Sequence, residues 1–411
     1  MKFFTFVFAF TSVFINSVFA EGTNWAVLVA GSKTYSNYRH QADICHAYQL
    51  LSGNGIPEEQ IIVFMYDDIA DNVQNPRKGE IINHPDGKDV YVNVPKDYIG
   101  DNCNADNFLS VLNGKDMTGI GSGKTLQSTK DDKIFVYYAD HGATGFVAMP
   151  SGGYLYATDL IQTIQDMYDN SMFKEMVFYM EACESGSMFE DLPTNLNVYV
   201  TTASNPTESS YACYYDSKLK TYLGDCYSVN WMENSDSSSL EKETLEEQYE
   251  KVKELTTESH VMQYGQLSID NETVSEFMDS QTQRKFIPNF IKVSERQMMD
   301  NRDVNLKYLV ANIYESENRK EFDFYLELLF TELKNRERIK ILFERINQKL
   351  KPYYKTVRRT KETFDDCFKK SIAGVEEKYG KFTDYSLQFA KVFYDACKNN
   401  VSHETIVNKL I

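Results

Sequence analysis

A histidine and a cysteine each follow an apolar run of the chain, and these two residue types together can carry out nucleophilic catalysis. His141 stands in the segment Tyr138–Gly145, and Cys183 stands in the segment Phe178–Ser187. A cysteine peptidase needs a thiolate, an imidazole that manages the proton of the thiol, and backbone N–H groups that bind the oxyanion. Cys183 and His141 supply the first two requirements.

Gly142 follows the histidine directly and is a candidate for the third requirement. A residue without a side chain lets a substrate carbonyl approach closely, so the N–H groups of Gly142 and Cys183 are candidate oxyanion donors. Taken singly, His141 is more often a structural histidine and Cys183 a buried core thiol. Their placement after two runs of the same kind favours the catalytic interpretation.

Five short apolar runs predict the strands that position these groups. They are rich in Val, Ile, Phe, Tyr and Met, as in strands that are covered on both faces of a parallel sheet. Stretches with helical periodicity separate them, which predicts an α/β fold with crossover helices. The predicted strands are 25–30, 61–66, 134–138, 176–180 and 198–202, and the predicted helices are 41–51, 105–112 and 157–168.

The reactive residues gather at one edge of the predicted sheet. In open α/β sheets, ligands bind beyond the carboxyl ends of the strands. The first strand leads to residues 37–40, the third to 140–142, the fourth to 181–183 and the fifth to 204–211. We therefore expect these four segments to line a single crevice.

Several segments of the first 265 residues resemble the sequence blocks of the legumain family of asparaginyl endopeptidases. The histidine block reads Asp140-His-Gly, and the cysteine block reads Glu181-Ala-Cys-Glu-Ser-Gly-Ser. The similarity follows the order of the family through the whole region and is weak over the C-terminal helices. Further matching segments are 38–43, 66–69, 94–98, 209–216, 222–225 and 259–264.

The resemblance implies a caspase-like α/β fold and cleavage of proteins and peptides on the carboxyl side of asparagine. It implies that Cys183 is the nucleophile, that His141 is the general base and acid, and that Asn37 orients the imidazole. It also implies that Asp140 can form a succinimide. We expect no cofactor and no metal.

A pocket that selects asparagine has to recognise both ends of a carboxamide. The carbonyl oxygen of the amide accepts hydrogen bonds, whereas the NH2 group donates them. Arg39 and His40 can donate to the oxygen, and Glu181 and Asp225 can accept from the NH2 group. The alternative for these charged residues is a structural ion-pair network. The serines expected on the pocket wall are Ser209 and Ser210.

Aspartate would enter such a pocket only in its protonated form. Its carboxylate is repelled by the acidic side of the pocket at neutral pH, whereas the protonated acid is nearly isosteric with asparagine. We therefore expect cleavage after aspartate under acid conditions only.

The chain divides into four segments. Residues 1–20 carry a single charge, Lys2, in an apolar stretch that ends at Ala20, which predicts a signal peptide. Residues 21–270 are the predicted catalytic domain, 271–303 a linker or activation segment, and 304–411 an all-α inhibitory prodomain. We expect a secreted-pathway protein that reaches a lysosome, a vacuole or the exterior. No later segment is long and apolar enough to predict a membrane anchor.

Apolar stripes at helical spacing predict a small bundle in the C-terminal segment. The stripes are 326–333, 339–350 and 385–396. Cys367 and Cys397 flank the connection to the last helix and are candidates for a disulfide. Seven cysteines leave at least one thiol unpaired, and glycosylation sequons begin at Asn271 and Asn400.

The tail and the rest of the chain carry opposite charge. Residues 301–411 hold 22 Lys and Arg against 17 Asp and Glu, a net charge of +5, whereas the remainder carries −22. Opposite charges favour docking of the two parts and argue against nucleic acid as a partner of the main domain. Acid would protonate carboxylates of the body and weaken this attraction.

Legumains carry a C-terminal prodomain that caps the crevice and is removed by self-cleavage at acid pH, so the resemblance implies that this tail is an intramolecular inhibitor. Asn301 is the predicted self-cleavage site. The alternatives are Asn289, Asp300 and Asn305.

Two other motifs favour less specific interpretations. His40, Asp43, Cys45 and His46 resemble a metal cluster, but they lie in one helix start without a second pair of ligands. Residues 119–125 are rich in glycine, yet their spacing differs from that of a phosphate-binding loop and they follow a helix. We expect an ordinary loop there.

Three competing functions stay open at this level. A catalytic subunit of the GPI transamidase has a similar histidine and cysteine arrangement but normally carries a membrane anchor. A peptide asparaginyl ligase would pass the thioester to an amine instead of water. An inactive scaffold protein would be expected to lack some of the residues proposed here, whereas the chain retains them all.

Overall fold

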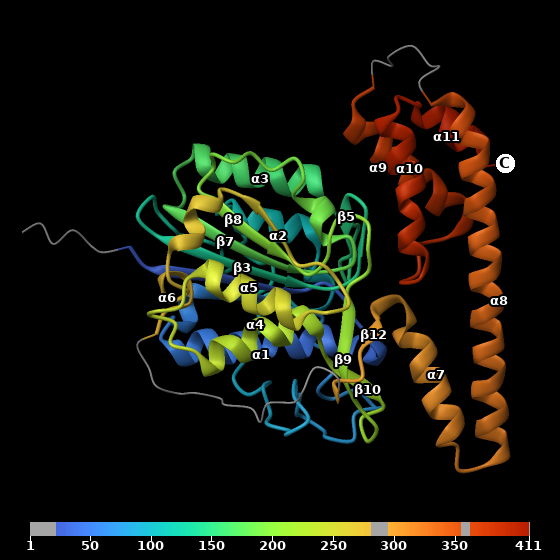
Figure 1. Ribbon diagram of the computed structural model, residues 1–411, viewed down its shortest axis with the longest axis horizontal. Coiled ribbons are helices and arrows are strands. Elements are labelled where there is room, and N and C mark those ends of the chain that lie inside the picture. Colours follow the sequence, from blue (N-terminus) through green and yellow to red (C-terminus); the bar gives the residue numbers. More distant parts are fainter. Residues whose placement is uncertain (1–21, 281–294, 355–361, 411) are drawn as a thin grey trace, which may run out of the picture.

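The computed structural model describes residues 22–280, 295–354 and 362–410 of the chain. The predicted signal peptide, residues 1–20, and the alternative cleavage site Asn289 lie outside these ranges. The described residues form a body built on one sheet and a helical tail on one side of it (Figure 1).

A six-stranded sheet lies at the centre of the body. Its order is β11-β8-β7-β3-β1-β2, in which β11 is antiparallel and the other neighbours are parallel. This arrangement confirms the predicted α/β fold, and each of the five predicted strands is present. The strands are β1 (Asn24–Ala30), β2 (Ile61–Phe64), β3 (Lys133–Ala139), β7 (Glu175–Glu181), β8 (Val198–Thr202) and β11 (Met262–Gly265).

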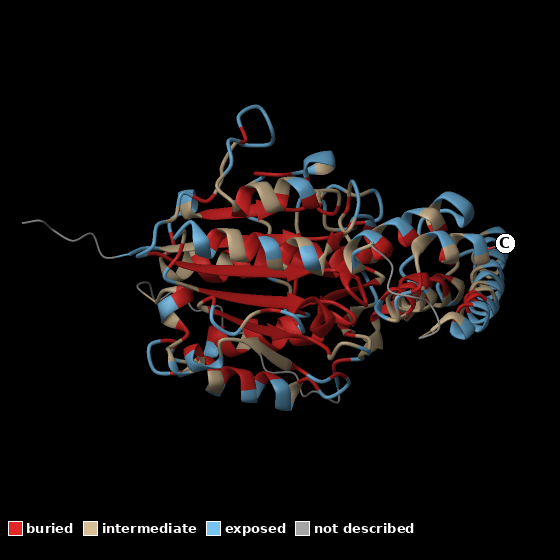
Figure 2. Cartoon of the chain, turned by 90° about the horizontal axis from the view of Figure 1, so that it is seen from above, coloured by how far each residue is buried: buried red, intermediate tan, exposed pale blue. Residues whose placement is uncertain are grey.

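Helices cover both faces of this sheet (Figure 1). One face packs against α1, α4 and α5, and the other packs against α2 and α3. Because the central strands are apolar on both faces, both layers are needed to bury them, and Figure 2 shows them buried. The helices are α1 (Tyr38–Asn54), α2 (Ala105–Leu112), α3 (Ala157–Asp169), α4 (Cys226–Ser237) and α5 (Leu245–Leu255).

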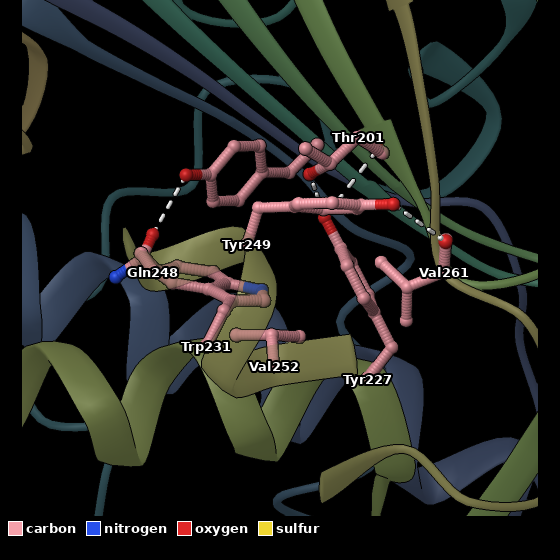
Figure 3. A pocket seen from close by; sticks show the side chains of 8 residues that line it. Thr201, Tyr227, Trp231, Gln248, Tyr249, Val252 and Val261 are labelled. Atoms are coloured by element: carbon pink, nitrogen blue, oxygen red, sulfur yellow. Dashed lines mark hydrogen bonds between the residues drawn. The ribbon is translucent and has the colours of Figure 1, made fainter. Parts of the chain in front are cut away.

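Aromatic side chains hold the layer of α4 and α5 against the sheet (Figure 3). The Tyr179 hydroxyl of β7 donates to Gln248 Oε1 at 2.7 Å, and the hydroxyls of Tyr227 and Thr201 lie 2.6 Å apart. Trp231 packs edge-on against Tyr179 with ring centroids 5.5 Å apart. The hydroxyls around this small cavity are thus satisfied from within the core.

Two small sheets flank the carboxyl ends of the central strands. In one of them, β9 (Tyr211–Asp216) pairs antiparallel with β10 (Thr221–Asp225) and also with β12 (Met299–Asp300), a segment of the predicted linker. This pairing returns the chain to the edge of the sheet where the reactive residues lie. The other small sheet contains β4 (Gly142–Ala143), β5 (Phe146–Val147) and β6 (Leu155–Tyr156).

The first residues of the predicted linker pack on the body. The short helix α6 (Ser275–Met278) buries Phe277 and Met278 in the core beneath the sheet. Because residues 271–280 are mostly polar, the sequence did not predict that Phe277 and Met278 are part of the core.

Five α-helices form the described part of the tail. The C-terminal half of α8 packs with α9, α10 and α11 around Phe343, Ile346 and Leu350. Ala143 and Phe146 of the body belong to the same apolar cluster, so the tail and the body share a core. No helix within the described residues is long and apolar enough to cross a membrane. The helices are α7 (Val304–Tyr314), α8 (Arg319–Leu350), α9 (Phe364–Tyr379), α10 (Lys391–Lys398) and α11 (His403–Lys409).

One predicted apolar stripe of the tail is not in its core. Residues 326–333 were expected to be buried, but Phe330 is 62% exposed and Leu333 is 45% exposed. The N-terminal half of α8 packs beside α7 and extends past the other tail helices (Figure 1), so Phe330 and Leu333 face solvent.

The predicted disulfide between Cys367 and Cys397 is present and joins α9 to α10. The other five cysteines are buried free thiols. We expect the double substitution Cys367→Ala and Cys397→Ala to destabilise the tail by about 3 kcal/mol, because the cross-link restricts a loop of 30 residues in the unfolded chain. Hydrogen exchange of α9 and α10 in increasing urea measures this loss.

The control for that experiment is Cys103→Ala, which removes a buried sulfur from the body instead. Equal exchange in α9 and α10 for the control and the double variant would contradict the role of the disulfide.

Candidate active site

His141 and Cys183 lie at equivalent positions beyond two neighbouring parallel strands. The register of β3 and β7 pairs Ala139 with Glu181, and the two reactive residues follow two positions later on each strand. The backbones touch here, because a Cβ on Gly142 would lie 2.0 Å from the carbonyl oxygen of Cys183. The structure therefore brings the backbones of the two predicted segments together and requires glycine beside the histidine.

Asn37 determines which nitrogen of His141 carries the proton. The Nε2 atom of His141 lies 2.9 Å from Asn37 Oδ1, and the amide of Asn37 is oriented by donating to the carbonyl oxygen of Lys33 at 3.2 Å. Since Oδ1 can only accept, Nε2 carries the hydrogen in the neutral imidazole. Nδ1 is then the basic nitrogen.

Burial keeps both reactive groups uncharged in this arrangement. It raises the pKa of the Cys183 thiol to about 11, which the charge of Arg302 only partly offsets. It lowers the pKa of His141 to about 4, although Asp384 of the tail lies 3.4 Å from Nε2 and acts in the opposite direction. At neutral pH the site thus holds a thiol and a neutral imidazole, which is a dormant state.

The predicted pocket contains the side chain of Asn301. Arg39 Nε donates to Asn301 Oδ1 at 3.0 Å, and Asn301 Nδ2 donates to Ser210 Oγ at 2.8 Å. The backbone N–H of Asn301 donates to the carbonyl oxygen of Ser210 at 3.0 Å. Ser210 also donates its N–H to Cys183 Sγ at 3.4 Å. One serine thus links the carboxamide of the linker to the thiol.

The acidic residues lie behind this contact instead of accepting from the amide. Asp225 Oδ1 accepts from Arg39 Nε at 2.9 Å, and Glu181 Oε2 accepts from the N–H and hydroxyl of Ser228 at 3.1 and 3.0 Å. Their predicted role as acceptors for the NH2 group is taken by Ser210. Burial and the neighbouring Asp225 raise the pKa of Glu181 well above its usual value.

His40 and Ser209 also differ from their predicted places. His40 Nδ1 lies 3.1 Å from Asp140 Oδ1 and 2.6 Å from Ser32 Oγ, so the ring supports the pocket from behind. Burial raises the pKa of Asp140 well above its usual value. Ser209 Oγ accepts from Arg302 Nη1 at 3.3 Å, on the far side of the Asn301–Arg302 bond.

The motif at the start of α1 does not converge on one point. His46 lies 2.7 Å from Asn83 Oδ1 and 2.9 Å from Asp236 Oδ2, whereas His40 faces Asp140. Within the described residues, a different trio presents ligand atoms within 4.8 Å of one another: His40, Asp140 and His141. All three already bond to groups of the pocket or to each other. Residues 119–125 form a loop, as predicted.

Sequence reasoning missed the contacts that hold the chain beyond Asn301. Arg302 Nη2 donates to Glu184 Oε2 at 2.5 Å, and Arg336 of α8 donates to the carbonyl oxygen of Arg302 at 2.7 Å. Arg336 also donates to Asp303 at 2.5 Å. Glu184 next to the reactive cysteine was a visible signal, but its basic partner lies in a segment that was treated as a linker.

Comparison with known proteins places the body within one family. The model of the peptidase C13 family matches residues 24–281. The legumain of Rattus norvegicus is 52% identical over 73% of this chain and 69% of its own length, and that of Homo sapiens is 57% identical over 62% and 59%. The vacuolar-processing enzyme beta-isozyme of Arabidopsis thaliana is 44% identical over 93% of this chain and 84% of its own length. Among solved structures, caspase-1 of Spodoptera frugiperda covers 60% of this chain and 86% of that chain at 10% identity, with a TM-score of 0.35.

We expect Cys183 to react slowly with iodoacetamide in the intact chain at pH 7. A thiol with a pKa of about 11 is ionised in about one molecule in 10⁴ at this pH, and the side chain is also buried. Peptide mapping by mass spectrometry after timed alkylation measures the rate. The exposed thiol introduced by Ser217→Cys is the control, and labelling of Cys183 within tenfold of that control would contradict the dormant state.

Proposed function

The chain belongs to the peptidase C13 family, and we propose that it is a cysteine-type endopeptidase that hydrolyses peptide bonds on the carboxyl side of asparagine. One observation carries this proposal. The pocket beside Cys183 holds an asparagine of the chain itself, Asn301, by three groups: its side-chain amide oxygen, its side-chain NH2 group and its backbone N–H. The strand before it, β12, pairs with β9 as an extended substrate would.

The proposed chemistry assigns a proton transfer to each member of the pair. Cys183 Sγ attacks the backbone carbonyl carbon of the asparagine. At the same time the proton of the thiol passes to Nδ1 of His141, the nitrogen that Asn37 leaves basic. The N–H groups of Gly142 and Cys183 bind the oxyanion. The imidazolium then gives its proton to the leaving amine. Water attacks the resulting thioester with His141 as the base and regenerates the thiol.

The charges of the pocket favour asparagine over aspartate. Asp43, Glu181 and Asp225 are fully buried, and Asp225 pairs with the guanidinium of Arg39. A further carboxylate would enter a site where burial has already raised the pKa of Asp43 and Glu181. A neutral carboxamide avoids this repulsion.

We expect a peptide with asparagine at the cleavage site to be cut about 10³-fold faster than its aspartate analogue at pH 7, and about tenfold faster at pH 5. These ratios follow from the protonated fraction of an aspartate with a pKa of about 3.9. The kcat/KM values of the two peptides at both pH values, measured with acid-treated enzyme, give the result.

Cys183→Ser is the control for that experiment and has to abolish both activities. Equal turnover of the two peptides at pH 7 would refute the pocket as assigned.

The tail is proposed to act as an intramolecular inhibitor, with self-cleavage after Asn301. Opposite charges meet across the contact, where Lys369 bonds Asp159 at 2.6 Å and Arg302 bonds Glu184. The alternative site Asn305 lies in α7, and its side chain is exposed. An acidic lysosome or vacuole, reached through the secretory pathway, is the compartment that fits an acid-activated precursor.

Protonation of His141 can drive release of the tail in acid. Its pKa is about 4 in the capped state, whereas a freely exposed imidazole has a pKa of about 6.5. The uncapped state takes up this proton first, so the capped state loses stability as the pH falls from about 6.5 to about 4. Protonation of Glu184 has the opposite effect and stabilises the capped state. Burial raises its pKa to about 7, so the capped state binds that proton more tightly, and this carboxyl does not drive release.

We expect the Cys183→Ser chain, which cannot cut itself, to show faster hydrogen exchange in α10 as the pH falls from about 6.5 to about 4, after correction for the intrinsic pH dependence. His141→Ala should remove part of this transition or move it to lower pH. His260→Ala, which changes an exposed histidine paired with Glu208, should leave it in place. An unchanged transition in the His141→Ala chain would rule out this histidine as the trigger.

A further inference from the structure

Arg296 is a buried cation at the point where the linker reaches the body. The residue is 2% exposed. Its guanidinium donates to Asn230 Oδ1 and, at 3.1 Å, to Glu233 Oε2. Its Cζ atom lies 5.4 Å from the centroid of the Tyr214 ring. Three residues of the body thus enclose one guanidinium with an amide oxygen, a carboxylate and an aromatic face, which are the groups that bind such a cation.

This pocket is held in shape by contacts that do not involve the arginine. Asn230 Nδ2 donates to Thr256 Oγ1 at 2.9 Å, which turns the Oδ1 atom of Asn230 toward the guanidinium. The Tyr214 hydroxyl donates to Glu233 Oε1 at 2.6 Å. Asn230 is fully buried, and the Glu233 side chain is 13% exposed. A site with these oxygens is costly to leave without a cation.

Tyr214 is strained in a way that serves the same contact. Its φ is 63°, a region that residues other than glycine seldom adopt. It lies between Cys213, which pairs with Gly224, and Tyr215, which pairs with Tyr222. Its N–H donates to the carbonyl oxygen of Arg296 at 2.8 Å. The strained backbone therefore aims both the N–H and the ring of Tyr214 at the linker, as strain at binding sites often does.

Arg296 stands five residues before Asn301, and β12 lies between the two contacts. We propose that the pocket formed by Tyr214, Asn230 and Glu233 is a substrate subsite for a basic side chain five residues before the cleaved asparagine. The inference rests on the proposed function. All three pocket residues belong to the body, so the subsite remains when another peptide replaces the linker.

Substrates with a guanidinium at this position should therefore be preferred. The test uses the full chain with Arg296→Ala, activated in acid, so that its own arginine does not compete. The substrates are acetyl-Arg-Gln-Met-Met-Asp-Asn-aminomethylcoumarin and the analogue in which uncharged citrulline replaces arginine. We expect kcat/KM to be about tenfold higher for arginine, as for one charged hydrogen-bonded contact.

Two variants in this background locate the preference. Glu233→Gln should bring the ratio of the two kcat/KM values close to one, whereas Glu254→Gln, on the exposed face of α5, should leave it unchanged. If the kcat/KM values of the arginine and citrulline peptides are nearly equal in the chain that keeps Glu233, the subsite is refuted. A tenfold ratio that survives Glu233→Gln overturns its assignment to this pocket.

A second measurement separates failure of the subsite from failure of the peptidase assignment. The short peptide acetyl-Met-Asp-Asn-aminomethylcoumarin lacks the basic position, so a chain that cuts neither long nor short peptides refutes the peptidase and not the subsite. In that case the Cys183→Ser chain decides the question. Adding Arg296→Gln should raise hydrogen exchange of the β12 amides several-fold, and unchanged exchange overturns the pocket.

Discussion

The site depends on one buried cation among carboxyl groups. Arg39 is fully buried, and its Nε atom donates both to Asp225 and to the side-chain amide oxygen, Oδ1, of Asn301. Asp43 and Glu181 are also fully buried, and their pKa values are raised first by burial and then by the charge of the neighbouring Asp225. The pocket is therefore close to neutral, and the ligand that completes it without adding charge is a carboxamide.

The placement of His141 and Cys183 at one edge of the sheet could be predicted because strand register determines it. Two neighbouring parallel strands that end at the same register place His141 and Cys183 at the same edge of the sheet. Such buried strands can be recognised in the sequence as apolar runs. The family suggested by the surrounding motifs is confirmed by the peptidase C13 match, and the disulfide between Cys367 and Cys397 is confirmed by the structure. These features depend on local patterns or on a single long-range pairing.

The remaining features could not be predicted because they depend on which surface each segment meets. The polar linker showed no periodicity, yet Arg296 and Asn301 are among the buried residues of the chain. The stripe that ends at Leu333 has the spacing of a core helix, but its residues Phe330 and Leu333 are exposed in the described structure. His40 was expected to donate to the amide oxygen together with Arg39, but the helix turns successive side chains about 100° apart and directs His40 toward Asp140 instead.

Separate contacts hold the two sides of the Asn301–Arg302 bond. On the N-terminal side, β12 pairs with β9 and Arg296 is enclosed by the body. On the C-terminal side, Arg302 bonds Glu184, and Arg336 holds the carbonyl oxygen of Arg302. Breaking the bond removes none of these contacts, so a cut chain would stay capped, with the new amine still near the thioester. Release therefore has to come from a change in the contacts themselves. Of the groups that titrate between neutral and acid pH at this site, His141 shifts the balance toward the open state, whereas Glu184 opposes it.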